Sequence, residues 1–294
     1  MKRKWERDLG LQGRMLFTMF LLAAVYLFFL AFLSYNRTPP IFMLLFVGGF
    51  MAIQYFYSDK LVLMSTGAHV VSESEAPELH GMITRLCAIA DLPKPQVAIV
   101  RTSVPNAFAT GRSPNKAVVA VTTGILDKLS SVELEAVLAH ELSHVKNRDM
   151  TVLTIASFIS TLAFYFVRYS LYFGNMGGDR RREGGGLLLV WLVSIAVWVV
   201  SFLLIRALSR YREYSADRGS AIITGQPSDL ASALMKISGI MDRVPSDDLR
   251  KVEGMNAFFI IPAISGSSIM DIFSTHPPVE KRIAKLEKMQ QEMS

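Results

Sequence analysis

Four long runs without a charged residue limit what this chain can fold into. Each run has 18 or 19 residues. As a helix it would measure about 27 to 29 Å, which matches the ~30 Å hydrocarbon core of a bilayer. The composition agrees, since 51% of the residues are hydrophobic and only 19% are charged. The pattern predicts an integral membrane protein with four transmembrane helices in two hairpins. The runs are residues 15–33, 39–57, 150–167 and 187–205.

Basic residues at the N-terminus predict the orientation of the first hairpin. Residues 1–14 carry five Lys or Arg residues, whereas the loop between the first two runs carries only Arg37. Because positively charged segments resist translocation, we expect the N-terminus in the cytoplasm. The first run is expected to be a retained anchor rather than a signal peptide, because no small-residue cleavage site follows it.

The orientation of the second hairpin does not follow from charge alone. The segment between the third and fourth runs is basic, and so is the flank after the fourth run. We expect a hairpin that spans the membrane, with a shallower hairpin packed against the protein as the alternative. In the spanning arrangement both termini and both long polar segments are cytoplasmic.

The excess of positive charge points to lipid rather than nucleic acid. The net charge is +6 and the isoelectric point is near 9.4, but the basic residues cluster beside the apolar runs. Anionic headgroups explain that distribution, so membrane lipids are expected partners and nucleic acid is not. The single cysteine, Cys87, excludes an intrachain disulfide and is compatible with a reducing cytoplasm.

The polar segments predict a mainly α fold with a small β-sheet. Apolar residues at helical or alternating spacing, together with Gly and Pro breaks, mark the elements. We expect helices at 75–90, 131–145, 206–224, 228–242 and 279–293, and short strands at 96–100, 106–110 and 117–122. The terminal helix is expected to be solvated, and residues 243–275 permit no assignment.

The pentapeptide at residues 140–144, HELSH, carries the chemistry. On a helix His140 and His144 share one face, so both imidazoles can bind one metal ion. Glu141 lies about 100° around the helix, beside the place of a metal-bound water, and is expected to act as a base. Ser130 and Glu133 form a capping box that supports a helix at this position. The motif predicts a zinc metalloprotease.

Catalytic zinc usually takes three protein ligands, so a third must come from elsewhere. Glu213 is the candidate, because Asp217 lies four residues later on the same helical face and could accept a proton from a ligand imidazole. The same spacing also fits an ordinary pair of surface carboxylates. A tight hairpin formed by the third and fourth runs would bring Glu213 towards the two histidines.

Five motifs occur in order along the chain: NAFATG at 106–111, VTTGIL at 121–126, HELSH at 140–144, REYSAD at 212–217 and STHPP at 274–278. With the four runs, they resemble the HtpX-type membrane zinc metalloproteases, whose wider group includes the CAAX prenyl-protein proteases. The resemblance implies that Glu213 is the third zinc ligand and that the fold is a gluzincin-like protease domain. It also implies cleavage of damaged or misfolded membrane proteins under stress, in a bacterial inner membrane.

This resemblance divides the chain into four parts. Residues 1–58 form the first transmembrane hairpin, and 59–149 hold the sheet and the zinc-binding helix. Residues 150–206 form the second hairpin, and 207–294 hold the third ligand. The partners that the resemblance implies are unfolded or membrane-protein substrates and other membrane quality-control proteins.

The expected mechanism uses one zinc ion held by His140, His144 and Glu213. It would lower the pKa of its bound water, and Glu141 would take the proton. His276 is the candidate donor to the developing oxyanion, since the family match places it near the site; a turn before Pro277 is its other interpretation. Substrate could bind as an added strand along the NAFATG motif. The residues proposed there are Asn106, Ala107, Phe108 and Ala109.

Two other functions stay open from the sequence. A CAAX-type prenyl-protein protease would use the same metal site, but the relatives of that type carry more membrane helices. A non-enzymatic scaffold or holdase stapled by zinc is the second alternative, although structural zinc usually takes four protein ligands.

Overall fold

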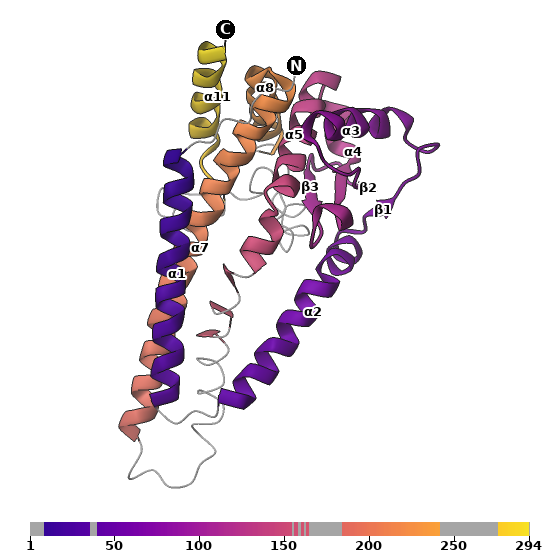
Figure 1. Ribbon diagram of the computed structural model, residues 1–294. Helices are drawn as coiled ribbons and strands as arrows, with labels where there is room; N and C mark the ends of the chain where they lie inside the picture. Colours follow the sequence, from indigo (N-terminus) through magenta and orange to yellow (C-terminus); the bar gives the residue numbers. More distant parts are fainter. Residues whose placement is uncertain are drawn as a thin grey trace. The chain divides into compact units, whose positions relative to one another are not determined.

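The computed structural model describes residues 9–35, 40–154, 156–157, 160–161, 163–164, 184–241 and 276–293. The chain forms two compact units. The polar unit contains residues 56–151 and 209–294, and the apolar unit contains residues 9–55 and 152–208. The described residues are mainly helical and include one small sheet (Figure 1), as the sequence predicts.

The apolar unit is built from long helices. They are α1 (Leu9–Tyr35), the first part of α2 (Pro40–Thr66) and the first part of α7 (Gly184–Thr224). Leu22, Ala156 and Leu208 pack together, and the Tyr26 hydroxyl donates a hydrogen bond to the carbonyl of Ala156. These contacts show that α1 lies beside both the third run and α7.

Two of the described helices are long and apolar enough to cross a membrane, over Leu9–Phe32 and Trp191–Thr224. Large apolar side chains of α1 point outward, including Leu16, Phe20 and Leu27, which are each more than 60% exposed. Such a surface suits lipid better than water. The second run lies in α2, and the described residues of the third run are helical up to Phe164, but the rest of that run lies outside the described residues.

The polar unit contains a four-stranded mixed sheet in the order β1-β2-β4-β3. β2 (Gln96–Val100) and β4 (Val118–Thr122) are parallel, whereas β1 (His69–Val70) and β3 (Ala107–Thr110) pair antiparallel with them. The three longer strands match the sequence prediction within one residue, and β1 was not predicted. Among the described strands, β3 lies at one edge of the sheet.

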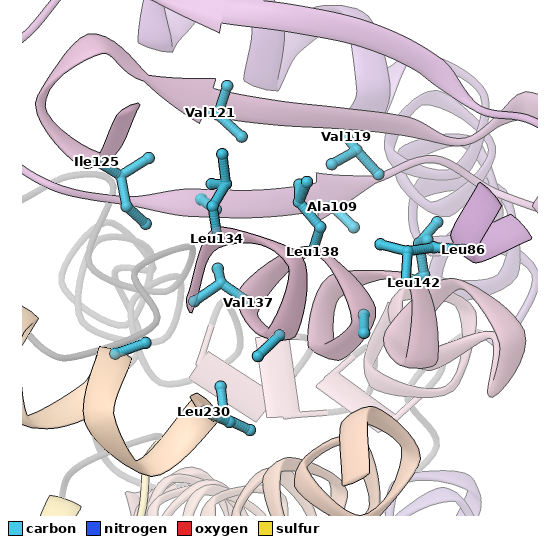
Figure 2. Close-up of a cluster of buried hydrophobic side chains, with 14 of the residues drawn as sticks. Leu86, Ala109, Val119, Val121, Ile125, Leu134, Val137, Leu138, Leu142 and Leu230 are labelled. Carbon is cyan, nitrogen blue, oxygen red and sulfur yellow. The ribbon is translucent and has the colours of Figure 1, made fainter. Parts of the chain in front are cut away.

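Both faces of the sheet are covered, which explains the continuous apolar character of its strands. Val119 and Val121 of β4 face α3 (Pro77–Ala90) and α5 (Ser131–Lys146), where Leu138 and Leu142 of α5 fill the core (Figure 2). The intervening Ala120 faces the opposite side, against Val62 near the end of α2. Apart from Gln96, Thr110 and Thr122 at their ends, the three longer strands are therefore apolar on both faces rather than at alternate positions.

Helix α5 begins with the capping box that the sequence predicts. The backbone N–H and the hydroxyl of Ser130 donate to Glu133 Oε2 over 2.9 and 2.8 Å. Ser232 and Lys236 of α8 (Pro227–Met241) donate to the same carboxylate over 2.6 and 2.7 Å. Burial opposes ionisation of this carboxyl group, but the hydrogen bonds from Lys236, Ser232 and Ser130 lower the pKa of Glu133 to about 2. The cap thus also joins α8 to α5.

The terminal helix α11 (Val279–Met293) has the predicted bounds but not the predicted environment. It packs against α8, with Leu286 fully buried in the core of the polar unit. Arg282 is also fully buried, because two carboxylates of α7 neutralise it. The prediction that this helix is solvated was wrong for the face that carries Arg282 and Leu286. Residues 243–275 lie outside the described residues.

Candidate metal centre

Two histidines of α5 present their ring nitrogens to one point. His140 and His144 are one turn apart, and their Nε2 atoms lie 3.1 Å from each other. His140 is almost fully buried, whereas the side chain of His144 is 17% exposed. Apolar packing of Leu138 and Leu142 holds this stretch of α5 against the sheet, so both imidazoles have a rigid base.

Glu213 of α7 completes a group of three. Its Oε2 lies 3.6 Å from His140 Nε2, and its Oε1 lies 3.5 Å from His144 Nε2. One ligand atom from each of the three residues lies within 4.8 Å of the others. The structure thus brings together residues 69 positions apart in the sequence. Ser220 strengthens this pairing of helices by donating to the Ala136 carbonyl of α5 over 2.7 Å.

Each imidazole has a carboxylate at its other nitrogen. Asp217 Oδ1 lies 3.0 Å from His140 Nδ1, which is the contact that the sequence suggested for Asp217. Asp149 Oδ2 lies 2.6 Å from His144 Nδ1, and the sequence analysis did not find it. A carboxylate at Nδ1 favours the tautomer with its proton on Nδ1 and leaves a lone pair on Nε2.

Each of these carboxylates is in turn paired with a buried arginine. Arg282 of α11 contacts Asp217 through two nitrogens, Nη2 at 2.6 Å and Nε at 2.9 Å, and its Nη1 lies 3.2 Å from Glu213 Oε2. Arg212 of α7 forms an ion pair with Asp149. Carboxylates placed near these cations stay ionised, and in that form they accept the imidazole protons.

The arrangement fits a divalent cation. With a proton on each Nδ1, the two Nε2 lone pairs point at each other over 3.1 Å, and a carboxylate lies beside them. Three electron-pair donors around one point repel one another unless a cation lies between them. Two imidazoles and one carboxylate are a set that zinc takes in hydrolytic enzymes, with a fourth position left for water.

The protonation of the two histidines points the same way. Burial alone would lower the pKa of His140, but Asp217 and Glu213 outweigh that effect and raise it to about 9. Burial and the nearby charge of His140 lower the pKa of His144 to about 3. At neutral pH the metal-free pair therefore carries one positive charge, an extra proton on the His140 ring, in the place where a bound cation would supply that charge.

Glu141 lies next to this group and is only 5% exposed. Burial raises the pKa of the Glu141 carboxyl group to about 7, and the charge of Glu213 adds to that effect, while the charge of His140 and the Ala109 amide oppose it. The Ala109 amide hydrogen bond connects the Glu141 carboxylate to the edge strand β3. A carboxyl group with a pKa near neutrality can both take up and release a proton at working pH.

His276 lies close to the group, as the sequence analysis expected. It is 7% exposed, and its Nδ1 lies 3.2 Å from Glu213 Oε2. At this distance the imidazole lies beside the carboxylate of the third candidate ligand. The structure thereby gathers His140, Glu141, His144, Glu213 and His276 in one site within the polar unit.

The four residues proposed for substrate binding make different contacts. Asn106 pairs with Thr122: its N–H donates to Thr122 Oγ1 over 2.8 Å, and its carbonyl accepts from the Thr122 N–H over 2.9 Å. Phe108 packs into the apolar cluster between the sheet and the end of α2. Ala107 and Ala109 are both buried on the α5 side of the sheet. The side chains of Ala107, Phe108 and Ala109 therefore pack within the polar unit, whereas the Asn106 contacts with Thr122 are made by its backbone.

A pocket opens beside His144. Eleven residues line it: Ala109, Thr110, Gly111, Ser113, Ala117, His144, Val145, Arg148, Asp149, Met150 and Thr151. Gly111 turns the chain with φ 126°, and an added Cβ would lie 2.3 Å from the Lys116 carbonyl, so only glycine fits there. The pocket joins the end of β3 to the exposed side of the metal centre.

The sequence analysis missed Arg282 and Asp149, and only Arg282 has a signal in the sequence. Arg282 occupies a position in the stripe formed with Val279, Ile283 and Leu286, and a charge within an apolar stripe indicates a buried partner. Asp149 is the last polar residue before the third run, which suggested only the end of a polar segment. Its pairing with His144 and Arg212 depends on the fold and has no signal in spacing.

Sequence comparison decides the family. The model of peptidase family M48 matches residues 73–290, which is most of the chain. The chain belongs to peptidase family M48. It is a metallopeptidase, as the HELSH motif predicted, and the three-residue group of the polar unit is the described cluster that could hold its metal ion.

Relatives named as proteases match over the whole length. The chain is 87% identical over 294 residues to "Protease HtpX homolog 2" of Methanosarcina acetivorans, with 100% of each chain covered. It is 58% identical over 295 residues to "Protease HtpX homolog" of Moorella thermoacetica, covering 100% of this chain and 99% of the relative. The HtpX resemblance inferred from the motifs is confirmed by these matches.

A solved structure shares the fold at much lower identity. The crystal structure of S. mikatae Ste24p superposes with a TM-score of 0.53 and 15% sequence identity, covering 95% of this chain and 66% of that one. The likeness supports a common architecture that includes both the helices and the sheet.

Proposed function

We propose that this M48 peptidase is a zinc-dependent endopeptidase of the cell membrane that cleaves damaged or misfolded membrane proteins. The observation that carries the proposal is the placement of Glu141 between a three-donor metal site and the backbone edge of β3. Zinc, when bound, supplies a Lewis acid and an activated water. The residues of the chain do the remaining work.

His140, His144 and Glu213 would hold the ion, and Glu141 would take a proton and pass it to the leaving amine. Its pKa of about 7 in the metal-free site would fall beside a divalent cation, so that the carboxylate form is present at neutral pH. His276 would donate a hydrogen bond to the oxygen that becomes negative as the peptide carbonyl is attacked.

The edge strand supports an extended substrate. A peptide added beside β3 would gain main-chain hydrogen bonds without any demand on most of its side chains. Such binding suits a protease that acts on many unfolded segments. Because the Phe108 side chain packs in the apolar cluster, we assign recognition to the β3 backbone, with Asn106 directly before it as the candidate side chain.

The membrane arrangement is part of the proposal. Two candidate spans in the described residues, together with the apolar runs 39–57 and 150–167, support four transmembrane helices in two hairpins. The basic N-terminal segment supports an active site and both termini in the cytoplasm. The helices around a small sheet and the ligand set support a gluzincin-like arrangement of the protease domain. Reporter fusions after residues 37, 175 and 294 would test this topology, and an active cytoplasmic reporter at residue 37 would contradict it.

The decisive experiment compares Glu141→Gln with Glu135→Gln, a matched change on the same helix. Glu135 is partly exposed and pairs with Arg85, away from the metal ligands. We expect Glu141→Gln to lower cleavage of a destabilised membrane protein in detergent by about 10² to 10⁴-fold, the usual contribution of a general base. Glu135→Gln should keep nearly full activity. Equal activity of both variants would reject the mechanism.

Metal and substrate class are tested separately. A chelator should abolish cleavage, and zinc should restore it at lower concentration than other divalent ions. Mass spectrometry of the products should show internal cuts in the membrane-protein substrate. Cleavage of a prenylated C-terminal peptide in its place would identify the CAAX-type alternative. The absence of any chelator-sensitive cleavage would favour a scaffold that holds zinc.

A further inference from the structure

Asp149 has a geometric role that the general zinc-protease scheme does not assign. The residue is 4% exposed and is the last one before the apolar run 150–167. Its Oδ2 lies 2.6 Å from His144 Nδ1. Its Oδ1 forms an ion pair with Arg212, which is 2% exposed. Each oxygen therefore has its own partner, and the carboxylate cannot rotate without losing one of them.

This pairing controls which nitrogen of His144 faces the metal site. The Asp149 carboxylate can only accept, so the proton of neutral His144 belongs on Nδ1. The Nε2 lone pair then points towards Glu213 Oε1, 3.5 Å away, and towards His140 Nε2. Without a fixed acceptor, the ring could take the other tautomer or turn about its bond to Cβ.

Arg212 connects this control to the third ligand. Arg212 and Glu213 are neighbours on α7, about 100° apart around the helix, so one pairs with Asp149 while the other faces the histidines. Asp217, one turn later, lies at Nδ1 of His140. The stretch 212–217 therefore supplies one ligand directly and orients the acceptors of the other two.

We infer that Asp149 is a positioning residue for His144, held by Arg212, and that it raises the affinity of the site for zinc. The inference rests on the proposed zinc site. It adds that residues 212–217 position all three ligands. Glu213 is itself a ligand, Asp217 contacts His140, and Arg212 holds the Asp149 carboxylate that contacts His144. Carboxylate partners of this kind typically contribute 10- to 100-fold to metal affinity.

The test uses the full-length protein in detergent with the Glu141→Gln change as background, so that proteolysis does not alter the sample. Zinc affinity is measured by competition with a chromophoric chelator, and the absorption spectrum of bound Co²⁺ reports the ligand set. Asp149→Asn keeps the shape of the side chain and removes its charge. Asp127→Asn is the matched control, because Asp127 is an exposed aspartate of the same unit.

We expect Asp149→Asn to weaken zinc binding 10- to 100-fold and to change the Co²⁺ spectrum, whereas Asp127→Asn leaves both unchanged. Asp149→Glu, which restores the charge, should recover part of the affinity. An Asp149→Asn affinity within twofold of the control would overturn the inference. Failure of the zinc site itself is distinguished by His144→Ala: if that variant also binds zinc as the control does, the proposed site is wrong.

A folding defect would not leave the inference undecided. Thermal unfolding of each variant in chelator reports its metal-free stability, which a merely structural role would lower. If Asp149→Asn does not fold, Arg212→Lys replaces it, since lysine keeps the charge but its shorter side chain ends in a different position from the Arg212 Nη2 that contacts Asp149 Oδ1. We expect three- to tenfold weaker zinc binding for Arg212→Lys with unchanged metal-free stability. Unchanged affinity in Arg212→Lys would then overturn the inference.

Discussion

Each of the two ligand histidines is supported by a carboxylate that is paired with an arginine. The two supports differ in how far they are buried. On the His140 side, Asp217 and Arg282 are both at most 2% exposed, and Arg282 binds Asp217 through two nitrogens. On the His144 side, the imidazole is 17% exposed and lines a pocket together with Asp149. The first support is enclosed by protein, whereas the second borders on space that a substrate or solvent can reach.

The difference indicates which support also stabilises the fold and which one acts mainly on metal binding. Arg282 also contacts Glu213, so the His140 support reaches two of the three ligands. The Asp149 support reaches only His144. A loss on the His140 side should therefore damage the fold as well as the metal site. A loss on the His144 side should mainly weaken metal binding.

The largest effect is expected from Arg282→Met. Removing this guanidinium leaves the carboxylates of Asp217 and Glu213 buried without their cation, which typically costs about 3 to 5 kcal/mol. We expect a large drop in the free energy of unfolding in chelator, measured by denaturant titration. A loss below about 1 kcal/mol would show that the His140 support is no stronger than a surface ion pair.

The next effect compares the two carboxylates directly. Asp217→Asn should weaken zinc binding by at least as much as Asp149→Asn, about 100-fold, because Arg282 then lacks the charge of its bidentate partner. It should also lower the metal-free stability by more than Asp149→Asn does, because Asp217 binds Arg282 through two nitrogens whereas Asp149 contacts Arg212 through one. Chelator competition and thermal unfolding of both variants provide the comparison. Equal losses of stability would remove the distinction between the two supports.

A third prediction uses pH. In the metal-free site His140 has a pKa of about 9 and His144 a pKa of about 3, so only His140 must lose a proton before it can bind zinc. Zinc affinity should therefore rise as pH increases towards 9, by about tenfold per unit below that value. Calorimetry on the Glu141→Gln variant, which lacks the other carboxyl group that titrates near neutrality, should show release of one proton on binding near pH 7.5 in two buffers of different ionisation enthalpy. Release of two protons would mean that both imidazoles start protonated.

The sequence predicted more of the ligands than of their supports. His140, Glu141 and His144 follow from helical periodicity, because residues four apart must share a face. Glu213 lies 69 positions after His144, and it was predicted as a ligand because a hairpin of the third and fourth apolar runs would bring it towards the histidines. The β2, β3 and β4 strands were visible as apolar segments between turn residues, but the two-residue β1 is too short to leave a pattern.

The supports could not be predicted because they depend on contacts between distant segments. The position of Arg282 in an apolar stripe indicates a buried partner, but only the fold shows that the partners are the carboxylates of Asp217 and Glu213 on α7. Asp149 ends a polar segment, and nothing in its neighbours indicates a contact with Arg212. Burying a charge requires a partner from elsewhere in the fold, so a single sequence gives the charge but not the partner.

The smallest effect is expected from breaking an exposed ion pair between α3 and α5, the helix that carries both histidines. Arg85 of α3 lies 2.7 Å from Glu135 of α5, but its side chain is 56% exposed, so water screens the attraction. Arg85→Ala should change the free energy of unfolding by less than about 1 kcal/mol and leave zinc affinity unchanged. Denaturant titration and chelator competition, as for the other variants, measure both quantities. If this variant weakened zinc binding as Asp149→Asn does, the losses would reflect a general loosening of α5, and the two histidine supports would have no specific role.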